Sequence, residues 1–528
     1  MNKKIVLFGL ALLLAASMAF AGGGGDKAPA ASGAPVKITV EIFDRGTDGG
    51  KSLAHDNAWT KWIHDKVLKD LNIDVTFMPV GRWSENTDII NLMASGSAPD
   101  LCYTYNQDMI ASFRDQGGIL DLAPYIDRYL PDLKKLLGAD PAITGKDFIY
   151  RNAIPGTGKI YSIPSYRVAL AQRNIFIRKD WLDKLGLPLP RTTQEFHDAL
   201  VAFRDRDPGN VGRTRVVPLA NADVQWELGN FILPSVDPKL SDRERWVYSI
   251  AERYLMMPGY KEGVRMVNQW YNEGLIFRDF PLLKGDDLNN MIKSGVVGAI
   301  SQNWDLPYRT DYKILEDLRK NVPGADFVPV DCIQSSDGIT HKNMMDKVGL
   351  QMFVPAFSKN KEAALQYLNW LAKPENYQFL QVGTVGVNHQ IVNGVPNTIG
   401  RPAGDLWFMN STNNIDYTMP MNGVEMGTPE LNSRVLALGY GDTPPEVIVN
   451  AYTISTRNAR AAAVFQSPPL TQGGVYGQTT QAKADALLSQ LVTCRPADFD
   501  RLWDSGYREW LASGAQEMYD ERSAAYPR

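Results

Sequence analysis

The chain has 528 residues, of which 44% are hydrophobic and 22% are charged, a composition typical of ordinary globular proteins. It excludes a disordered chain, a collagen-like chain and a membrane protein with many spans. Lys and Arg number 55 against 59 Asp and Glu, so the formal net charge of −4 gives no basic excess for binding nucleic acid. Three scattered cysteines, Cys102, Cys332 and Cys494, are too few for a disulfide framework or a zinc site.

The first 21 residues have the pattern of a secretory signal peptide. A short basic region precedes an apolar run over residues 5–20, and Ala19-Phe20-Ala21 matches an A-x-A cleavage site. A membrane anchor, the alternative, would need a longer apolar run. No cysteine stands near the cleavage site to carry a lipid, so we expect a periplasmic protein with a cleaved signal peptide and no lipid anchor. Residues 22–35, rich in Gly, Ala, Pro and Ser, are expected to form a flexible leader.

Strands and helices alternate over the next part of the chain. The hydrophobic pattern predicts a strand at 37–43, a helix at 57–71, a strand at 74–79, a helix at 84–93 and a further strand from residue 98. This order indicates an α/β fold with a largely parallel sheet. Because such sheets bind ligands outside the carboxyl ends of their strands, the loops after these strands are the first candidates for a binding site.

Later helices are marked by their caps. Thr192-Thr193-Gln194-Glu195 is a capping box, and Asp207-Pro208 ends the helix that follows it. Further helices are expected at about 360–372 and within 499–519. Residues 205–212 resemble a calcium-binding loop, but Val216 stands where the acidic twelfth residue is needed. We therefore interpret the segment as a plain turn and expect no metal.

Signatures of catalysis are missing from the sequence. It contains neither a G-x-S-x-G nucleophile motif nor a phosphate-binding loop, and its five histidines form no H-x-x-x-H or H-E-x-x-H pair. A pair of carboxylates of the kind that glycosidases use would leave no signature of spacing among 59 acidic residues. A hydrolase therefore stays open as an alternative.

Four motifs occur in chain order: residues 94–101 (ASGSAPDL), 158–164 (GKIYSIP), 174–187 (NIFIRKDWLDKLGL) and 358–370 (SKNKEAALQYLNW). Together they resemble extracellular solute-binding protein family 1, the carbohydrate-binding components of bacterial ABC importers, and the resemblance covers essentially the whole mature chain. It implies a two-lobed α/β periplasmic binding protein fold. Each lobe would be a mostly parallel sheet flanked by helices, and a hinge of crossing segments would join the lobes.

The resemblance also implies the lobe boundaries of the chain and its binding partners. Lobe 1 is expected to take residues 36–167 and 340–389, and lobe 2 to take residues 168–339 and 390–528, the last with the C-terminal helices. The implied partners are a carbohydrate ligand and the membrane permease of an ABC importer. We expect a monomer that binds no nucleic acid and needs no cofactor.

A sugar offers apolar C–H faces and a fringe of hydroxyls, so its site needs flat aromatic rings beside planar polar groups. Trp304 and Asp305 are the strongest candidates, because they follow the apolar strand 298–303 and resemble a family loop in which Trp stacks on a sugar; a core position is the alternative for Trp304. The other candidates follow predicted strands or lie near predicted crossings: Asp44, Arg45, Trp83, Tyr105, Asn106, Tyr166, Arg167, Trp226, His389 and Trp407.

The sequence thus predicts a periplasmic solute-binding protein. It would capture a carbohydrate, with an oligosaccharide favoured, by closing two lobes, and would deliver it to a permease without a chemical step. Two alternatives remain: a secreted carbohydrate-active hydrolase, and a binding protein for another solute such as a peptide or an amphiphile.

Overall fold

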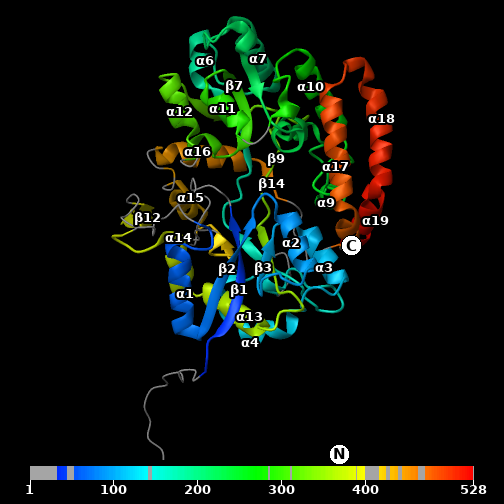
Figure 1. Cartoon of the computed structure of the whole chain (residues 1–528). Coiled ribbons are helices and arrows are strands. Elements are labelled where there is room, and N and C mark those ends of the chain that lie inside the picture. The colour runs from blue at the N-terminus through cyan, green and yellow to red at the C-terminus, as the bar shows by residue number, and fades with distance from the viewer. Residues whose placement is uncertain are drawn as a thin grey trace, which may run out of the picture.

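The computed structural model describes residues 33–44, 53–140, 146–283, 286–309, 312–387, 389–398, 416–423, 428–437, 440, 443–461 and 470–526. These residues form two α/β bodies, one above the other in Figure 1, and the helices of the C-terminal region stand along one flank. The predicted signal peptide, most of the predicted leader, and the candidates Arg45 and Trp407 lie outside the described residues.

The lower body is built on strands from both ends of the chain. They are β1 (Val36–Asp44), β2 (Ile73–Gly81), β3 (Cys102–Thr104), β4 (Ile163–Arg167), β10 (Val348–Phe353) and β13 (Met421–Asn422). β1 pairs with β2 in parallel over its whole length, and the other four form a sheet in the order β13-β4-β10-β3. A parallel bridge from Val40 to Leu101 links the two groups into one layer.

The upper body contains a four-stranded sheet in the order β6-β7-β5-β8. Its strands are β5 (Arg173–Arg178), β6 (Val217–Ala220), β7 (Val297–Asn303) and β8 (Phe327–Val330). A short hairpin, β11 (His389–Val392) and β12 (Val395–Thr398), lies outside both sheets.

Both sheets are mixed, which corrects the prediction of mostly parallel sheets. β10 is antiparallel to β3 and β4, and β5 is antiparallel to β7 and β8. The reason is the path of the chain. β5 and β10 enter their bodies directly from the crossing segments and so start at the edge between the bodies, whereas β1, β4, β7 and β8 end at that edge. The α/β class and the two-lobed arrangement are as predicted.

Helices cover both faces of each sheet (Figure 1). The lower body has α1 (Ala58–Leu71), α2 (Glu85–Ala94), α3 (Gln107–Asp115), α4 (Ile126–Tyr129), α5 (Pro131–Leu137), α13 (Lys361–Leu371) and α14 (Pro374–Val382). The upper body has α6 (Lys179–Leu185), α7 (Thr193–Arg206), α8 (Gly229–Ile232), α9 (Asp242–Tyr248), α10 (Tyr260–Asn272), α11 (Asp287–Lys293) and α12 (Ile314–Asn321). The helices α15 (Pro429–Ala437), α16 (Pro445–Thr456), α17 (Thr471–Thr493), α18 (Phe499–Trp510) and α19 (Gln516–Ala525) follow.

Local sequence explains the start and the end of α7. The Glu195 N–H donates to the Thr192 hydroxyl at 3.1 Å, and the Thr192 N–H donates to the Glu195 carboxylate at 3.2 Å, which confirms the predicted capping box. Asp207 ends the helix in the left-handed region, at φ 45°. Its carboxylate accepts the N–H groups of Val211 and Gly212, so the segment that resembles a calcium loop is a turn held by its own aspartate.

The C-terminal helices pack on both bodies. Leu488 and Leu491 of α17 lie in the core of the upper body with residues of α10. The beginning of α17 instead lies on α3 of the lower body, where a Cβ added at Gly473 would stand 2.2 Å from the Asp108 carboxylate. Along the part of the chain that the structure describes, no helix is both long and apolar enough to span a bilayer.

Crossing segments join the bodies and hydrogen-bond to one another. The Met345 N–H donates to the Leu170 carbonyl at 2.8 Å, and the Met344 N–H donates to the Arg460 carbonyl at 3.1 Å. In the same region β9 (Lys342–Asn343) pairs in parallel with β14 (Ala459–Arg460). Three distant stretches of chain therefore form one narrow connection between the bodies.

The lower body also includes a stretch from late in the chain. Tyr417 and Met419 lie in its core, and β13 pairs with β4. Residues 416–422 therefore belong with the lower body, beyond the boundary expected at residue 389.

Candidate functional site

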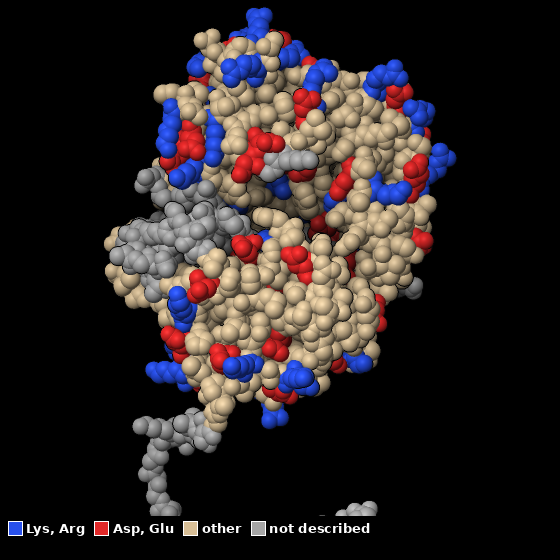
Figure 2. Space-filling model, viewed as in Figure 1, with Lys and Arg blue, Asp and Glu red and all other residues tan. Residues whose placement is uncertain are grey.

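The carboxyl ends of the lower strands face the upper body. Asp44 at the end of β1 is in register with Gly81 at the end of β2, and the Arg82 N–H donates to the Asp44 carbonyl at 2.9 Å. The surface is hollowed between the two bodies, with basic and acidic side chains both along the hollow (Figure 2). We call this hollow the cleft.

On the lower side of the cleft, Arg82 lies among aromatic rings. Its guanidinium is 4.4 Å from the ring centre of Tyr105 and 5.1 Å from that of Trp83. Tyr105 in turn stacks on Phe43 at 5.9 Å. An ion pair of 2.7 Å to Glu85 holds Arg82 in place. Trp83 is 76% exposed, an unusual state for so large an apolar ring, and such a ring offers a flat face to a ligand.

Three further predicted residues lie at this edge. Asn106 caps α3, accepting the N–H of Asp108 at 3.1 Å, and its amide donates to Asn86. Tyr166 packs edge-on against Phe148. Arg167 ends β4, where the first crossing begins, and its backbone N–H donates to the Lys347 carbonyl at 2.7 Å.

The guanidinium of Arg167 interacts electrostatically with side chains of both bodies. Burial lowers its pKa, while Tyr105, Asp346 and Glu252 favour its charged form. Tyr105 belongs to the lower body and Glu252 to the upper body, so Arg167 stands where the two sides of the cleft meet.

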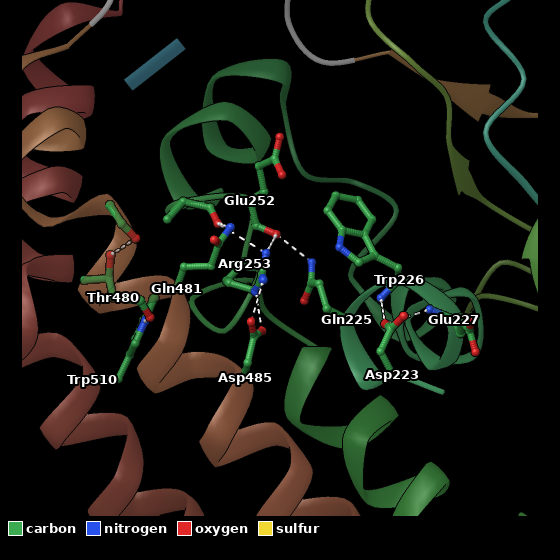
Figure 3. A network of polar contacts seen from close by, with 12 residues as sticks. Asp223, Gln225, Trp226, Glu227, Glu252, Arg253, Thr480, Gln481, Asp485 and Trp510 are labelled. Carbon is green, nitrogen blue, oxygen red and sulfur yellow. Dashed lines mark hydrogen bonds and ion pairs between the residues drawn. The ribbon is translucent and has the colours of Figure 1, made fainter. Parts of the chain in front are cut away.

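Trp226 is the corresponding ring of the upper body (Figure 3). It sits in a π-helical turn, Val224–Leu228, whose first N–H groups are capped by the Asp223 carboxylate. The guanidinium groups of Arg173 and Arg253 lie 5.6 and 6.0 Å from its ring centre. The indole is half-buried, which leaves part of the ring open to the cleft.

A strained hairpin turn lies beside Trp226. Ala251 and Glu252 both have positive φ, 48° and 57°, although neither is glycine. The turn is closed by the Ile250 N–H to the Arg253 carbonyl at 3.0 Å and by the reciprocal bond at 2.8 Å. Two consecutive left-handed residues make this a type I′ turn, which normally takes Asn-Gly. Such strain persists only where surrounding contacts impose it, and it is concentrated at functional sites.

The contacts that impose the turn are visible in Figure 3. The Gln225 amide donates to the Glu252 carbonyl at 2.5 Å, and the Gln481 amide of α17 donates to the Ala251 carbonyl at 3.4 Å. Arg253 is held by Asp485 of α17. The Glu252 carboxylate and the Trp226 indole point to the same side of this network, away from Asp485. Burial raises the pKa of Glu252, with Arg253 and Arg167 opposing the rise.

A second carboxyl lies behind Trp226. Burial, followed by repulsion from Asp223, raises the pKa of Glu227 to about 7. Glu227 accepts the N–H of Ala222 and the side-chain amide of Gln302, so both of its oxygens are used inside the protein. It supports the π-helical turn and does not reach into the cleft as a free acid.

Three predicted residues are placed elsewhere. Trp304 is 6% exposed and packs edge-on against Tyr452 at 5.4 Å, so its burial corresponds to the core alternative and not to a ligand contact. Asp305 is buried, accepts the hydroxyl of Tyr440 at 2.6 Å and pairs with Arg309 at 2.9 Å. His389 is buried in the lower body, with Nδ1 2.8 Å from the Val382 carbonyl, because the chain does not cross there.

The structure thus places Asp44, Trp83, Tyr105, Asn106, Tyr166 and Arg167 at or next to the carboxyl ends of lower-body strands, and Trp226 in the upper body. It adds residues that the sequence analysis missed: Phe43, Arg82, Arg173, Glu252 and Arg253. Arg82 adjoins Trp83 at the end of a predicted strand, so its position was a usable signal. Arg173 and Glu252 follow only from the fold.

Comparison with known proteins agrees with this architecture. Residues 51–250 match the family model described as bacterial extracellular solute-binding protein. Lipoprotein LipO of Bacillus subtilis is 24% identical over 61% of this chain and 62% of its own length. The fructooligosaccharide ABC transporter substrate-binding protein FusA of Streptococcus pneumoniae is 25% identical over 56% of this chain and 55% of its own length. The chain therefore spans about three fifths of the length of these relatives.

Among solved structures, the alginate-binding protein AlgQ2 without calcium superimposes with a TM-score of 0.66 at 19% identity, covering 94% of this chain and 98% of that one. At this identity the likeness concerns the fold alone, which is the two-lobed fold described above. With the matching family model and the curated relatives, it shows what this chain is similar to: residues 51–250 resemble the bacterial extracellular solute-binding proteins, and the fold is the one that such proteins have.

Proposed function

We propose that this protein captures an oligosaccharide in the cleft and delivers it to an ABC-type permease. The observation that carries the proposal is that each body has an accessible tryptophan beside an arginine: Trp83 beside Arg82 in the lower body and Trp226 beside Arg173 in the upper body. The relative FusA, named for a fructooligosaccharide ABC transporter, supports both the ligand class and the partner.

Sugar rings bind through their C–H faces and their hydroxyls. The exposed ring of Trp83 and the half-buried ring of Trp226 supply apolar faces, while Glu252 and the cleft arginines supply acceptors and donors. Two stacked rings and several charge-assisted hydrogen bonds, less the cost of ordering the ligand, suffice for micromolar affinity, about −8 kcal/mol.

Binding energy is also used to close the bodies. The crossings meet in a few backbone hydrogen bonds around Leu170, Met345 and Arg460, so a change in their backbone angles rotates one body against the other. A ligand that touches both tryptophans interacts with more protein when the cleft is closed, and it therefore shifts the population toward the closed form. The permease would then recognise that closed shape.

No chemical step is part of the proposal. The carboxyl with a pKa of about 7, Glu227, is occupied by Ala222 and Gln302, and we assign it a structural role. We also propose that the protein is exported by its signal peptide, acts as a free periplasmic monomer without a lipid anchor, and needs neither metal nor cofactor.

Calorimetry and small-angle scattering across an oligosaccharide panel test the proposal. At least one glycan should bind with micromolar affinity and reduce the radius of gyration, and chromatography should show the glycan intact after incubation. Trp226→Ala should weaken that binding at least tenfold. Products released during incubation would instead identify a hydrolase, while binding of peptides or amphiphiles alone would identify another solute class.

A further inference from the structure

Four arginines lie along the cleft, and they differ in what neutralises them. Arg82 pairs with Glu85 at 2.7 Å, and Arg253 pairs with Asp485 at 2.6 Å. Within the described part of the chain, neither Arg167 nor Arg173 has a carboxylate oxygen within 4.0 Å. The last two flank the first crossing, one at the end of β4 and one at the start of β5.

Arg173 is the more constrained of the two. Its Nε is buried and lacks a hydrogen-bond acceptor among the described residues, while its guanidinium lies 5.6 Å from the Trp226 ring centre. Burial lowers the pKa of Arg173, and the carboxylates of Asp223 and Glu227, which form no ion pair with it, only partly oppose this effect. A buried donor left in this state is costly unless a ligand supplies the missing acceptor.

A small pocket adjoins Arg173. Asn230, Asp331, Thr340 and Lys342 contribute to its wall. Lys342 forms an ion pair with Asp331 at 2.9 Å, so this carboxylate is already shared with a cation. The wall of this pocket thus carries two cationic side chains, Arg173 and Lys342, and one carboxylate, that of Asp331.

Carboxylates near the two arginines are committed elsewhere. Asp223 caps the π-helical turn, and Glu227 accepts from Ala222 and Gln302. Asp346 accepts the Val348 N–H and lies 3.7 Å from Arg151. Glu252 faces the cleft itself, where a sugar hydroxyl can donate to it.

From this arrangement we propose that the oligosaccharide is acidic, a chain of uronic acid residues whose carboxylates are bound by Arg173 and Arg167. This inference rests on the proposed function and narrows its ligand class. A guanidinium matches a carboxylate through two parallel N–H···O bonds to two charged oxygens, whereas a neutral hydroxyl offers a single uncharged oxygen. Trp226 beside Arg173 would stack on the same sugar whose carboxylate Arg173 holds.

Esterification gives a matched pair of probes, because it removes the charge and keeps length and linkage. Titrations of the full chain would use tetragalacturonate and tetramannuronate, their methyl esters, and neutral tetrasaccharides of glucose, galactose and fructose. One of the acids should bind at least about tenfold more tightly than its ester, and its affinity should fall with rising salt. Arg173→Gln and Arg167→Gln should each remove about tenfold of the affinity for the acid and weaken the binding of the ester by a clearly smaller factor, because the ester keeps the hydroxyls but lacks the charge.

Two further variants keep the test decisive. Arg173→Lys retains the positive charge but loses the pair of parallel N–H donors, so its affinity for the acid should lie between those of wild type and Arg173→Gln. It also provides a test if Arg173→Gln fails to fold. Arg501→Gln, on α18 and 70% exposed at its side chain, is the control for loss of a positive charge and should bind like wild type.

The outcomes separate the inference from the proposed function. The inference is wrong if a neutral glycan binds as tightly as every acid, or if both arginine variants bind the acid with wild-type affinity. In either case the proposed function, the binding of an oligosaccharide, still stands. If no glycan of either kind binds, the proposed function itself fails.

Discussion

Arg253 holds Asp485 with two parallel hydrogen bonds, Nε to Oδ1 at 2.6 Å and Nη2 to Oδ2 at 2.7 Å. The first residue ends the strained turn at Ala251 and Glu252, and the second belongs to α17. The pair therefore fastens a cleft loop to the C-terminal helix, although the two residues are 232 positions apart.

Breaking this pair should cost stability. The Arg253 side chain is 4% exposed and that of Asp485 is 45% exposed, so the pair is only partly screened by water. We expect Arg253→Ala to lower the free energy of unfolding by about 2 kcal/mol, measured by urea denaturation. Arg265→Ala, which removes the same two-pronged geometry from the exposed pair with Asp500, should cost less than about 1 kcal/mol. Equal losses would show that burial of Arg253 adds nothing.

The strained turn predicts a stabilising glycine. At Ala251 the positive φ penalises any side chain with a Cβ, and Ala251→Gly should raise the free energy of unfolding by about 1 kcal/mol. Ala482, exposed within α17, has ordinary helical geometry, so Ala482→Gly should lower it by about 1 kcal/mol. Thermal melting of the two variants should therefore move in opposite directions, and destabilisation by both would contradict the assigned strain.

Two tryptophans with different surroundings should separate stability from binding. Trp304→Ala empties a buried site beside Tyr452 and should cost about 3 kcal/mol of unfolding free energy. Trp83→Ala removes an exposed ring and should change stability by less than about 0.5 kcal/mol while weakening the glycan at least tenfold. Circular dichroism in urea and calorimetry measure the two effects. A Trp304→Ala protein of normal stability and lost affinity would restore the sequence-based expectation.

Asp108 should make stability depend on pH. Burial raises its pKa from 3.8 to about 6, so between these values the folded state binds the proton that the unfolded state has released. Its contribution is present below pH 4 and is lost as pH rises through 6, up to about 3 kcal/mol. Asp108→Asn should therefore be more stable than wild type at pH 7.5, with the advantage shrinking at pH 4.5. Melting curves at both values test this, and an advantage independent of pH would rule it out.

The contact of α17 with α3 should resist even one added methyl group. At an open helical position Gly→Ala stabilises by about 1 kcal/mol, but a Cβ at Gly473 would meet the Asp108 carboxylate at 2.2 Å. Gly473→Ala should instead destabilise, by about 1–3 kcal/mol. Thr479→Ala, exposed on the same helix, is the control and should be neutral or slightly stabilising. Urea denaturation measures both changes, and a Gly473→Ala protein more stable than wild type would exclude tight packing at this position.

Sequence patterns were informative where structure is local. The capping box at Thr192 and the strand at 37–43 depend on neighbouring residues, and both are present. Asp44, Trp83 and Tyr105 also follow the carboxyl ends of the first strands, a position that β/α alternation predicts; their contact with a ligand stays a prediction.

Long-range packing was beyond the sequence patterns. Trp304 follows an apolar strand, as a ligand-binding ring would, but Tyr440 and Tyr452 from 136 and 148 residues later cover it. Arg173 gives no local signal, since its environment comes from Trp226 and the pocket beside Lys342. The mixed sheets arise from the direction in which the crossings deliver β5 and β10, which periodicity does not encode.

The placement of β13 against β4 has a consequence for biosynthesis. The lower body begins with the first strand of the chain, yet its sheet is complete only when residues 421–422 have been made. An amino-terminal half emerging from the ribosome cannot finish this core, so the nascent polypeptide remains incompletely folded until about four fifths of it exists. Such late closure would suit the export that we propose for this chain.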